Sequence, residues 1–431
     1  MRTRCSDDMA WLPFVTAEYV HATGDATILS EKVPFLSGAP LGPDEHDRYE
    51  KFELGASASS LFEHCRRALE RASTSGAHGL PLMGDGDWND GMNRVGAKGS
   101  GESVWLGWFL IATMSRFASL CDLTRDADQA IRWRSRGGAL RSAIMNSAWD
   151  GAWYVRAFHD DGSIVGSSSR RECRIDSIAQ SWSVLCGAVD EGRAKVALRS
   201  AVEQLVLEPE RLVLLLTPPF DSTRHDPGYI RAYPPGVREN GGQYTHAAAW
   251  LGLAHATLGD GQGAERIFRL LNPIRRTLTR QDVTRYRIEP YVVAGDVYSA
   301  PPHVGRGGWS WYTGSAAWLY RLGVEAILGL VLERGLLRID PCIPPAWHGF
   351  ESWLRIGEET VHVVVENPDG SGAGVASLTI DGVRSEPQSI RLGPRDSARG
   401  GPREVRVRLG MPRPAARTLA GKPNARRSAQ S

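Results

Sequence analysis

The segment from Gly84 to Asp90 reads GDGDWND and holds three aspartates next to Trp88 and Asn89. It contains too much glycine for a helix interior and is too polar for a buried strand, so it predicts a surface loop that carries function. An indole can stack on the apolar face of a sugar ring, and a nearby carboxyl group can donate a proton to a glycosidic oxygen. The residue types in this loop therefore fit carbohydrate chemistry.

A calcium-binding loop is one alternative for the same residues. Asp85, Asp87 and Asn89 have the alternating spacing of such a loop. A calcium loop needs glycine where this sequence has Asp90, and glutamate where it has Gly96. These two mismatches argue against calcium.

Two further alternatives concern the stretch that follows. Residues 96–103, GAKGSGES, imitate a phosphate-binding P-loop, but Glu102 occupies the position of the essential lysine. The loop can also be a solvated turn whose aspartates cap a helix starting near Ser103. The residues by themselves leave this structural interpretation open beside the catalytic one.

The string DWNDGMNRVG followed by GESVWLGWFL resembles the catalytic loop of glycoside hydrolase family 94, which holds cellobiose and chitobiose phosphorylases. These two strings are most similar to the phosphorylase-like C-terminal region of cyclic β-1,2-glucan synthases. By this resemblance Asp90 is the catalytic general acid, and Trp88 and Asn89 belong to the sugar site. The resemblance extends from about Arg2 to Val365.

The chain begins MRTRCSDDMAWLPF, which is similar to a segment of the family that holds the glycosyl unit and the incoming phosphate. The resemblance assigns Arg2 to phosphate binding, and Arg4, Asp7 and Asp8 to substrate binding. These residues can also be ordinary solvated charges at an easily frayed end. In the family a β-sandwich and a linker usually precede this segment, so we expect a catalytic domain that is truncated at its N-terminus.

A second motif reads ENGGQYTH and places His246 seven positions after Glu239, at the expected start of a helix. The free N–H groups of a helix N-terminus suit an oxyanion, although a single histidine there is more often structural. The corresponding ENGGxxxH motif of the family supplies a sugar-contacting glutamate and a phosphate-contacting histidine. The resemblance therefore assigns Glu239 to the substrate and His246 to phosphate.

A third motif, GRGGWSWYTGS, combines glycines that allow a close backbone approach with a threonine-glycine pair that opens a helix. From the residues alone, Trp309 and Trp311 are equally compatible with a core. In the family the matching pair binds phosphate, which assigns Thr313 and the amide of Gly314 to phosphate. Gln180, on a helix within ECRIDSIAQSW, resembles a family position near the sugar.

Helical periodicity surrounds these motifs up to about Leu332. Ser60 and Glu63 form a capping-box pair before an amphipathic segment that runs to Ala72. The same period recurs over Val104–Leu120, Ile178–Cys186, Ala194–Val206, Ala247–Leu258 and Ala264–Leu271. Periodicity alone predicts a large all-α domain. The family resemblance makes it an (α/α)6 barrel over residues 1–333.

Short β patterns interrupt and follow the helices. Residues 153–166 alternate around Asp161-Gly162 and predict a hairpin. Residues 334–410 contain short β runs, including one that ends in the turn Asp381-Gly382, and predict a small C-terminal β-sandwich like that of the family. Residues 411–431 are basic with almost no bulky apolar side chain, and we expect this tail to be disordered.

Composition narrows the functional class. A net charge of +2 over 431 residues implies no general attraction to nucleic acid or to an anionic membrane. Fourteen tryptophans and eleven tyrosines favour a carbohydrate ligand. The six cysteines lack metal-binding spacing and predict reduced thiols of a cytoplasmic enzyme. We expect no secretory signal, because Arg2, Arg4, Asp7 and Asp8 follow Met1 without an apolar stretch. The apolar run Trp309–Leu332 contains Arg321 and Glu325, which argues against a membrane segment.

The activity implied by the resemblance is inverting phosphorolysis of β-linked gluco-oligosaccharides, with β-1,2-glucan as the expected substrate and α-glucose 1-phosphate as the product. The enzyme would be a hexosyltransferase, and the reaction would also run in the direction of synthesis. Inorganic phosphate is the co-substrate and is already a nucleophile, so we expect no protein base, no cofactor and no metal.

Two other functions stay open. In an inverting β-glucan hydrolase, Glu239 would activate a water molecule instead. A non-catalytic glucan-binding remnant of a cyclic β-1,2-glucan synthase would bind sugar without turnover. The expected truncation also predicts a homodimer, or association with a chain that supplies the missing N-terminal region.

Overall fold

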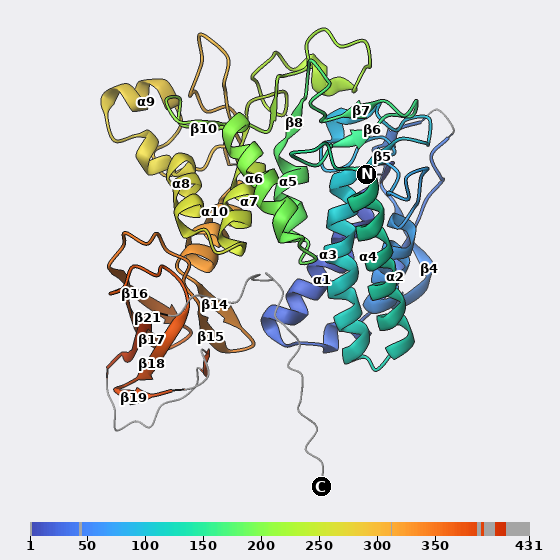
Figure 1. Ribbon diagram of the computed structural model, residues 1–431. Helices are drawn as coiled ribbons and strands as arrows, with labels where there is room; N and C mark the ends of the chain where they lie inside the picture. Colours follow the sequence, from blue (N-terminus) through green and yellow to red (C-terminus); the bar gives the residue numbers. More distant parts are fainter. Residues whose placement is uncertain (1, 43–44, 312, 386–388, 392–400, 411–431) are drawn as a thin grey trace.

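Helices account for most of the regular structure up to Ile327, and strands account for most of it beyond Leu330, in the computed structural model of the protein (Figure 1). The structure describes residues 2–42, 45–311, 313–385, 389–391 and 401–410. The tail predicted to be disordered, residues 411–431, lies outside the described residues. The chain is mostly helical with some sheet, as the sequence predicts.

An inner layer of helices forms the centre of the fold. Its members are α1 (Asp8–Thr23), α3 (Val104–Leu123), α5 (Ser177–Leu185), α7 (Thr245–Thr257) and α10 (Ser315–Tyr320), which continues as the π-helix Arg321–Ile327. Each contacts the next in this order. Almost every side chain of α3, α5 and α7 is buried, as expected for helices that are apolar around most of their circumference.

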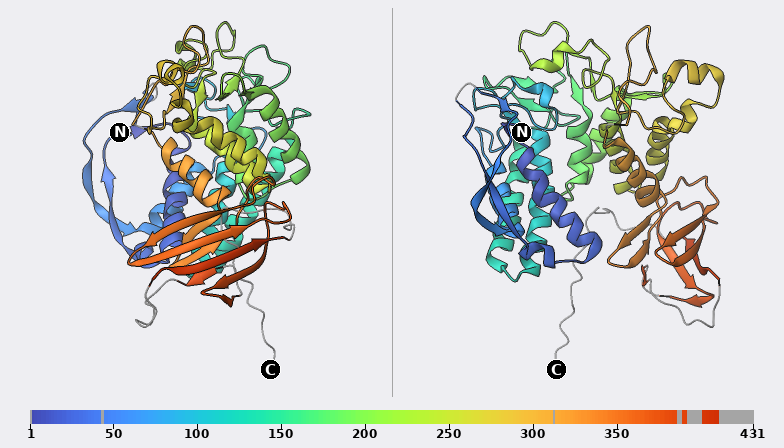
Figure 2. Two further views of the ribbon diagram at one scale, coloured as in Figure 1. Left: turned by 90° about the vertical axis from the view of Figure 1, so that its left-hand side faces the viewer. Right: turned by 180° about the vertical axis from the view of Figure 1, so that it is seen from behind.

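An outer layer covers these helices. It consists of α2 (Leu61–Ala72), α4 (Ala127–Ser147), α6 (Glu191–Leu205) and α8 (Gly261–Leu271), and each packs on the inner helix that precedes it in the chain (Figure 2). Helix α2 begins at the predicted cap, because the Ser60 hydroxyl accepts a hydrogen bond from the Glu63 N–H at 3.2 Å. Its buried residues are Cys65, Ala68, Leu69 and Ala72, which share one face.

Helix α3 also passes a length and composition test for a membrane span. It is the one such helix in the described part of the chain, and 83% of the stretch is buried inside the protein. The apolar side chains of α3 therefore pack against neighbouring helices in this structure.

Helix α1, at one end of the inner layer, has an apolar face that no other element of the described residues covers completely. On this face Met9, Leu12, Val15 and Tyr19 are exposed, spaced three or four residues apart. Ion pairs between Glu18 and Arg321 (3.6 Å) and between His21 and Glu333 (3.3 Å) bridge α1 to the end of the helical region. The described residues supply five inner and four outer helices, so they do not complete a ring of six pairs.

Residues 32–60 form a strand pair where the sequence analysis predicts helical structure. Strand β2 (Lys32–Ser37) pairs in antiparallel fashion with β4 (Glu53–Ser60) beside α2. The helix prediction was wrong here because Pro34 cannot donate a backbone hydrogen bond, and because the second strand consists largely of Gly, Ser and Ala. The short strands β1 (Arg2–Thr3) and β3 (Asp47–Arg48) pair nearby.

The strands after Leu330 form two sheets. One has the order β14 (Leu330–Glu333), β15 (Leu336–Ile339), β20 (Ser389–Arg391). The other has the order β16 (Gly349–Ile356), β17 (Glu359–Glu366), β21 (Arg403–Leu409), β18 (Val375–Ile380), β19 (Val383–Arg384). In β17 and β21 buried and exposed residues alternate, which leaves one face of the larger sheet in solvent.

The loops that carry the motifs lie at the N-terminal ends of the inner helices, and the C-terminal strands lie at the opposite end (Figure 1). Short strand pairs organise these loops: β5 (Glu102–Ser103) with β6 (Ala157–Phe158) and β7 (Ile164–Val165), β8 (Ile175–Asp176) with β11 (Leu216–Thr217), β9 (Val206–Leu207) with β10 (Leu212–Val213), and β12 (Gln243–Tyr244) with β13 (Asp296–Val297). The β6–β7 pair is the predicted hairpin, and the short helix α9 (Arg280–Tyr286) lies in the same loop region.

Candidate active site

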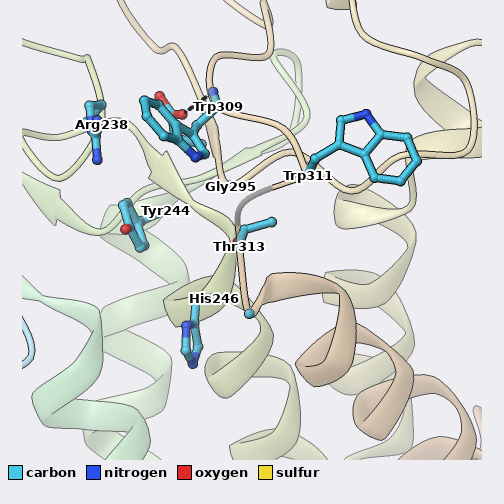
Figure 3. A pocket seen from close by; sticks show the side chains of 9 residues that line it. Arg238, Tyr244, His246, Gly295, Trp309, Trp311 and Thr313 are labelled. Atoms are coloured by element: carbon cyan, nitrogen blue, oxygen red, sulfur yellow. Dashed lines mark hydrogen bonds between the residues drawn. The ribbon is translucent and has the colours of Figure 1, made fainter.

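A pocket of about 710 Å³ opens at the N-termini of α7 and α10. Figure 3 shows its side chains, which come from the second and third motifs and from the segment between them. The lining residues are Arg238, Tyr244, His246, Gly295, Asp296, Trp309, Trp311, Thr313 and Gly314. Two of the three motif segments found in the sequence therefore share one pocket.

The N-termini of two inner helices adjoin in this pocket. His246 lies in the first turn of α7, and its ring carbon Cε1 is 3.6 Å from the point where a Cβ on Gly314 would lie. The Thr313 hydroxyl accepts a hydrogen bond from the Ser315 N–H at 3.0 Å. Backbone N–H groups at two helix N-termini make this part of the pocket suited to an anion. The structure thus brings together His246, Thr313 and Gly314.

The imidazole of His246 is poorly solvated. Burial lowers its pKa to about 3, so the ring is neutral near pH 7. Among the described residues its Nε2 atom has no hydrogen-bond partner. A neutral imidazole with an unpaired nitrogen can donate a hydrogen bond to an anionic oxygen when its proton is on that nitrogen.

The acidic loop reaches the same pocket wall through Trp88. The Trp88 ring lies 5.5 Å from the His246 ring and 5.3 Å from the Tyr244 ring, measured between centroids. The neighbouring Asn89 is buried, and within the described chain neither polar atom of its side-chain amide has a partner. The first motif therefore adjoins the second, whose side chains share the pocket with the third, so the three segments lie in one region.

The three aspartates of the loop differ in their surroundings. Asp90 is exposed and begins a short 3-10 helix that ends at Met92. Burial and a hydrogen bond to Asp90 raise the pKa of the Tyr229 phenol. Asp85 is buried and lies 3.0 Å from the His46 imidazole, and Asp87 is buried completely. Of the three, Asp90 is the exposed one, and it is not among the residues that line the pocket, so its assignment as the general acid stays a prediction.

Asp87 belongs to a buried ionic network below the loop. The Arg156 guanidinium donates hydrogen bonds to both Asp87 oxygens, at 2.7 and 2.5 Å, and its Nε atom is 3.3 Å from Asp176. The Ser103 hydroxyl also donates to Asp87, at 2.6 Å. Burial opposes the charge on Arg156, but the two carboxylates raise its pKa above the usual value.

This network connects the acidic loop to two inner helices. Ser103 caps α3 by accepting from the Leu106 N–H, and Asp176 caps α5 by accepting from the Ile178 N–H. Asp87 itself accepts a hydrogen bond from the Asn89 N–H at 3.1 Å. Arg156 therefore holds the backbone that carries Trp88, Asn89 and Asp90 in place.

Glu239 is not among the lining residues, but it adjoins the lining residue Arg238, whose Nε atom is 3.4 Å from the Glu239 carboxylate. Burial raises the pKa of Glu239, and the charges of Asp90 and Asp296 act in the same direction. The assignment of Glu239 to substrate binding stays a prediction.

Four lining residues were missed by the sequence analysis, Arg238, Tyr244, Gly295 and Asp296, and two more, Trp309 and Trp311, had been left open between core and site. Arg238 and Tyr244 flank the glycines of the second motif, and this adjacency was the signal that could have found them. Asp296 lies outside every motif, and it reaches the pocket because β13 pairs with β12, opposite Tyr244. Strand pairing of this kind leaves no local signal in a sequence.

Gln180 is not among the residues that line the pocket, and its assignment to the sugar site stays a prediction. Its side chain has no solvent exposure. The amide oxygen accepts from the Tyr154 N–H, and the amide nitrogen donates to the carbonyls of Tyr154 and Asp176. These hydrogen bonds tie the Gln180 side chain to the backbone of the loop above α5.

The N-terminal segment lies along the acidic loop rather than in the pocket. The Ser6 N–H donates to the Gly86 carbonyl at 2.9 Å. Arg2 contacts the Gly38 carbonyl, Arg4 contacts the Gly42 carbonyl, and neither arginine is among the lining residues. Their assignments to phosphate and to substrate therefore stay predictions.

Asp7 and Asp8 occupy different environments. Burial raises the pKa of Asp7 to about 7, although the Trp11 indole N–H donates to its carboxylate at 2.9 Å. Asp8 is exposed and accepts a hydrogen bond from the Thr3 hydroxyl. In the described part of the chain no cluster of three or more His, Cys, Asp or Glu side chains could hold a metal ion.

The chain belongs to the glycosyl hydrolase 94 superfamily, because residues 1–329 match the profile of its catalytic domain. This match confirms the family resemblance found in the motifs. The chain is 46% identical over 393 residues to the cyclic beta-(1,2)-glucan synthase NdvB of Rhizobium meliloti (strain 1021), covering 91% of this chain and 14% of the synthase.

Phosphorylases are more distant relatives. The chain is 29% identical to the N,N'-diacetylchitobiose phosphorylase of Vibrio furnissii, covering 89% of this chain and 45% of that protein. The chain therefore spans less than half the length of either relative. A solved structure described as a sialidase superposes with a TM-score of 0.53 at 13% identity, over 75% of this chain and 29% of the other, which shows similarity of fold alone.

Proposed function

We propose that the protein is an inverting phosphorylase of β-linked gluco-oligosaccharides, that β-1,2-glucan is its substrate and that α-glucose 1-phosphate is its product. The observation that carries this proposal is that His246 and Thr313 line one pocket at two helix N-termini, and that Trp88 of the acidic loop lies next to His246. An anion site, an aromatic face and an exposed carboxyl group are the parts that phosphorolysis of a glycoside needs. The glucan synthase relative supports the choice of substrate.

In this mechanism phosphate binds at His246, Thr313 and the amide of Gly314, with Arg2 as a further contact. A phosphate oxygen attacks the anomeric carbon from the face opposite the leaving group, and the glycosidic carbon–oxygen bond breaks. Asp90 transfers its proton to the departing oxygen, so the sugar leaves as an alcohol. Arg4, Asp7, Asp8, Trp88, Asn89 and Glu239 hold the sugar in this proposal.

The direct test is to incubate the protein with inorganic phosphate and a panel of β-linked gluco-oligosaccharides, and to assay glucose 1-phosphate. We expect the product from β-1,2-linked substrates, and no sugar release without phosphate. Release of free glucose without phosphate would favour the hydrolase alternative with Glu239 as base. Binding of glucan in calorimetry without turnover at any phosphate concentration would favour a non-catalytic remnant.

Substitutions in the anion site give a selective prediction. His246→Ala and Thr313→Ala are each expected to raise the phosphate concentration needed for half-maximal rate by about ten- to a hundredfold, since charge-assisted hydrogen bonds contribute roughly 1.5–3 kcal/mol. The sugar requirement should change much less. Steady-state kinetics in both substrates measures the two effects, with His348→Ala and Thr360→Ala, exposed residues of the C-terminal region, as controls. A selective loss of sugar affinity would contradict the assignment.

We further propose that another protein surface covers the exposed apolar stripe of α1, either from a second copy or from a chain that supplies helices to close a six-pair barrel. Apolar surface left in water costs about 25 cal/mol per Å². The protein alone should therefore self-associate, or show low stability and weak activity.

Light scattering over a range of concentrations measures this association. Leu12→Lys with Val15→Lys should reduce it, whereas Ile131→Lys, at an exposed position of α4, should not. A monomer that melts cooperatively above about 60 °C would contradict the proposal.

We also propose an arrangement for the C-terminal sheets and a cellular location for the protein. The two C-terminal sheets are proposed to form the β-sandwich predicted for residues 334–410. Cys5, Cys65, Cys121, Cys173 and Cys186 are free thiols, which fits the proposed cytoplasmic location.

A further inference from the structure

The buried carboxyl group of Asp296 has no role in the proposed mechanism. Only 2% of the residue is exposed, yet it lines the pocket. Its Oδ1 atom accepts a hydrogen bond from the Trp309 N–H at 2.7 Å. Its Oδ2 atom makes no hydrogen bond of normal geometry with a described residue, although burial raises the pKa of this carboxyl group and the nearby Arg238 lowers it. A buried polar atom without a partner is costly, so this oxygen is expected to meet a donor when a ligand is bound.

The protein holds this carboxylate in one orientation. Gly308 passes so close that a Cβ there would lie 2.6 Å from both carboxylate oxygens. The Gly308 N–H also donates to the Asp296 carbonyl at 3.0 Å. The backbone on one side and the strand pair on the other restrict the side chain, so Oδ2 has little freedom to turn toward another partner.

The chemistry around Asp296 restricts what the ligand can be. An ionised carboxylate only accepts hydrogen bonds, and a phosphate dianion would bring its own negative charge against it, whereas a sugar hydroxyl is a neutral donor. Next to it, the Trp309 indole is about half exposed and has the Arg238 guanidinium over its ring at 5.1 Å. An aromatic face beside a fixed carboxylate oxygen is the combination that holds a pyranose by stacking and hydroxyl recognition.

We propose that Asp296 accepts a hydrogen bond from one hydroxyl group of a bound glucose unit and that Trp309 stacks on the same unit, an inference that rests on the proposed phosphorylase function. Asp296 would then determine which sugar, or which linkage, the pocket admits. The glucose unit can be the one transferred or the acceptor, and the experiment below separates the two.

The experiment measures kcat/KM in the direction of synthesis, with glucose 1-phosphate and glucose, for the wild-type protein and for Asp296→Asn and Asp296→Ala. One arm replaces the acceptor by 2-, 3-, 4- or 6-deoxyglucose, and the other replaces the donor by the corresponding deoxyglucose 1-phosphates. Asp296→Asn keeps an oxygen for the Trp309 N–H, so it guards against loss of folding in Asp296→Ala. Asp122→Asn, at an exposed position of α3, is the matched control.

We expect one deoxy compound in one arm to react about ten- to a hundredfold more slowly than its parent with the wild-type protein, as for loss of a hydrogen bond to a charged group. With either Asp296 variant that ratio should fall to near one, while the control keeps the wild-type ratio. The arm in which the ratio changes identifies the glucose unit.

Unchanged ratios in both Asp296 variants would overturn the inference. A change in the phosphate requirement alone would also overturn it, because Asp296 would then act by repelling the anion. If the wild-type protein makes no product, the proposed function fails, and calorimetric binding of the same deoxy panel by the wild-type and Asp296→Asn proteins still decides the hydroxyl contact.

Discussion

Replacing Asp90 by asparagine is expected to lower turnover by about two to four orders of magnitude, the usual contribution of a general acid. The amide keeps the shape of the side chain and loses the proton that the departing oxygen needs. Because Asp90 is exposed and its loop is held from below by Asp87, the fold should be unaffected. Single-turnover kinetics measures the rate, and calorimetry should show nearly unchanged sugar binding.

Asp87→Asn is the matched comparison within the same loop. The acidic cluster alone does not distinguish these aspartates, but the structure assigns Asp87 to the Arg156 pair. Asp87→Asn should therefore reduce stability as well as activity. A mild effect of Asp90→Asn together with a purely catalytic effect of Asp87→Asn would show that the general acid is the wrong residue of the two.

Replacing Arg156 by methionine is expected to lower the free energy of unfolding by about 3–5 kcal/mol, the range for breaking one side of a buried ion pair. The guanidinium has no solvent exposure, and its removal leaves Asp87 and Asp176 buried without a compensating charge. Denaturant unfolding followed by fluorescence measures the change.

The control for Arg156 is Arg134→Met. Arg134 pairs with Asp122 on the surface, where the side chains are 46% and 48% exposed, so its loss should cost about 1 kcal/mol or less. Equal small effects of the two substitutions would mean that the buried network does not stabilise the loop. The double variant Arg156→Met with Asp87→Leu should recover part of the loss, because it leaves fewer buried charges unpaired.

Much of the local structure could be predicted from the sequence because its causes are local. The Ser60 cap, the amphipathic face of α2 and the hairpin around residues 161–162 each depend on side chains within a few positions of one another. The motifs also indicated the family, because they are long sequence strings, and the match to the superfamily profile covers them. Glycine content and polarity placed the motifs in loops for the same local reason.

The roles of particular side chains were decided by contacts between distant parts of the chain. Asp87 and Asp90 look alike in the sequence, and a hydrogen bond from Arg156, 69 residues away, separates them. The Gln180 amide forms hydrogen bonds with the backbone of Tyr154. Asp296 lines the pocket because β13 pairs with β12. Spacing along the chain does not encode such approaches, because they arise from the packing of whole helices and strands. The sequence thus determined the helical class, the family and the segments that carry chemistry, and tertiary packing decided which atoms of those segments remain available to a ligand.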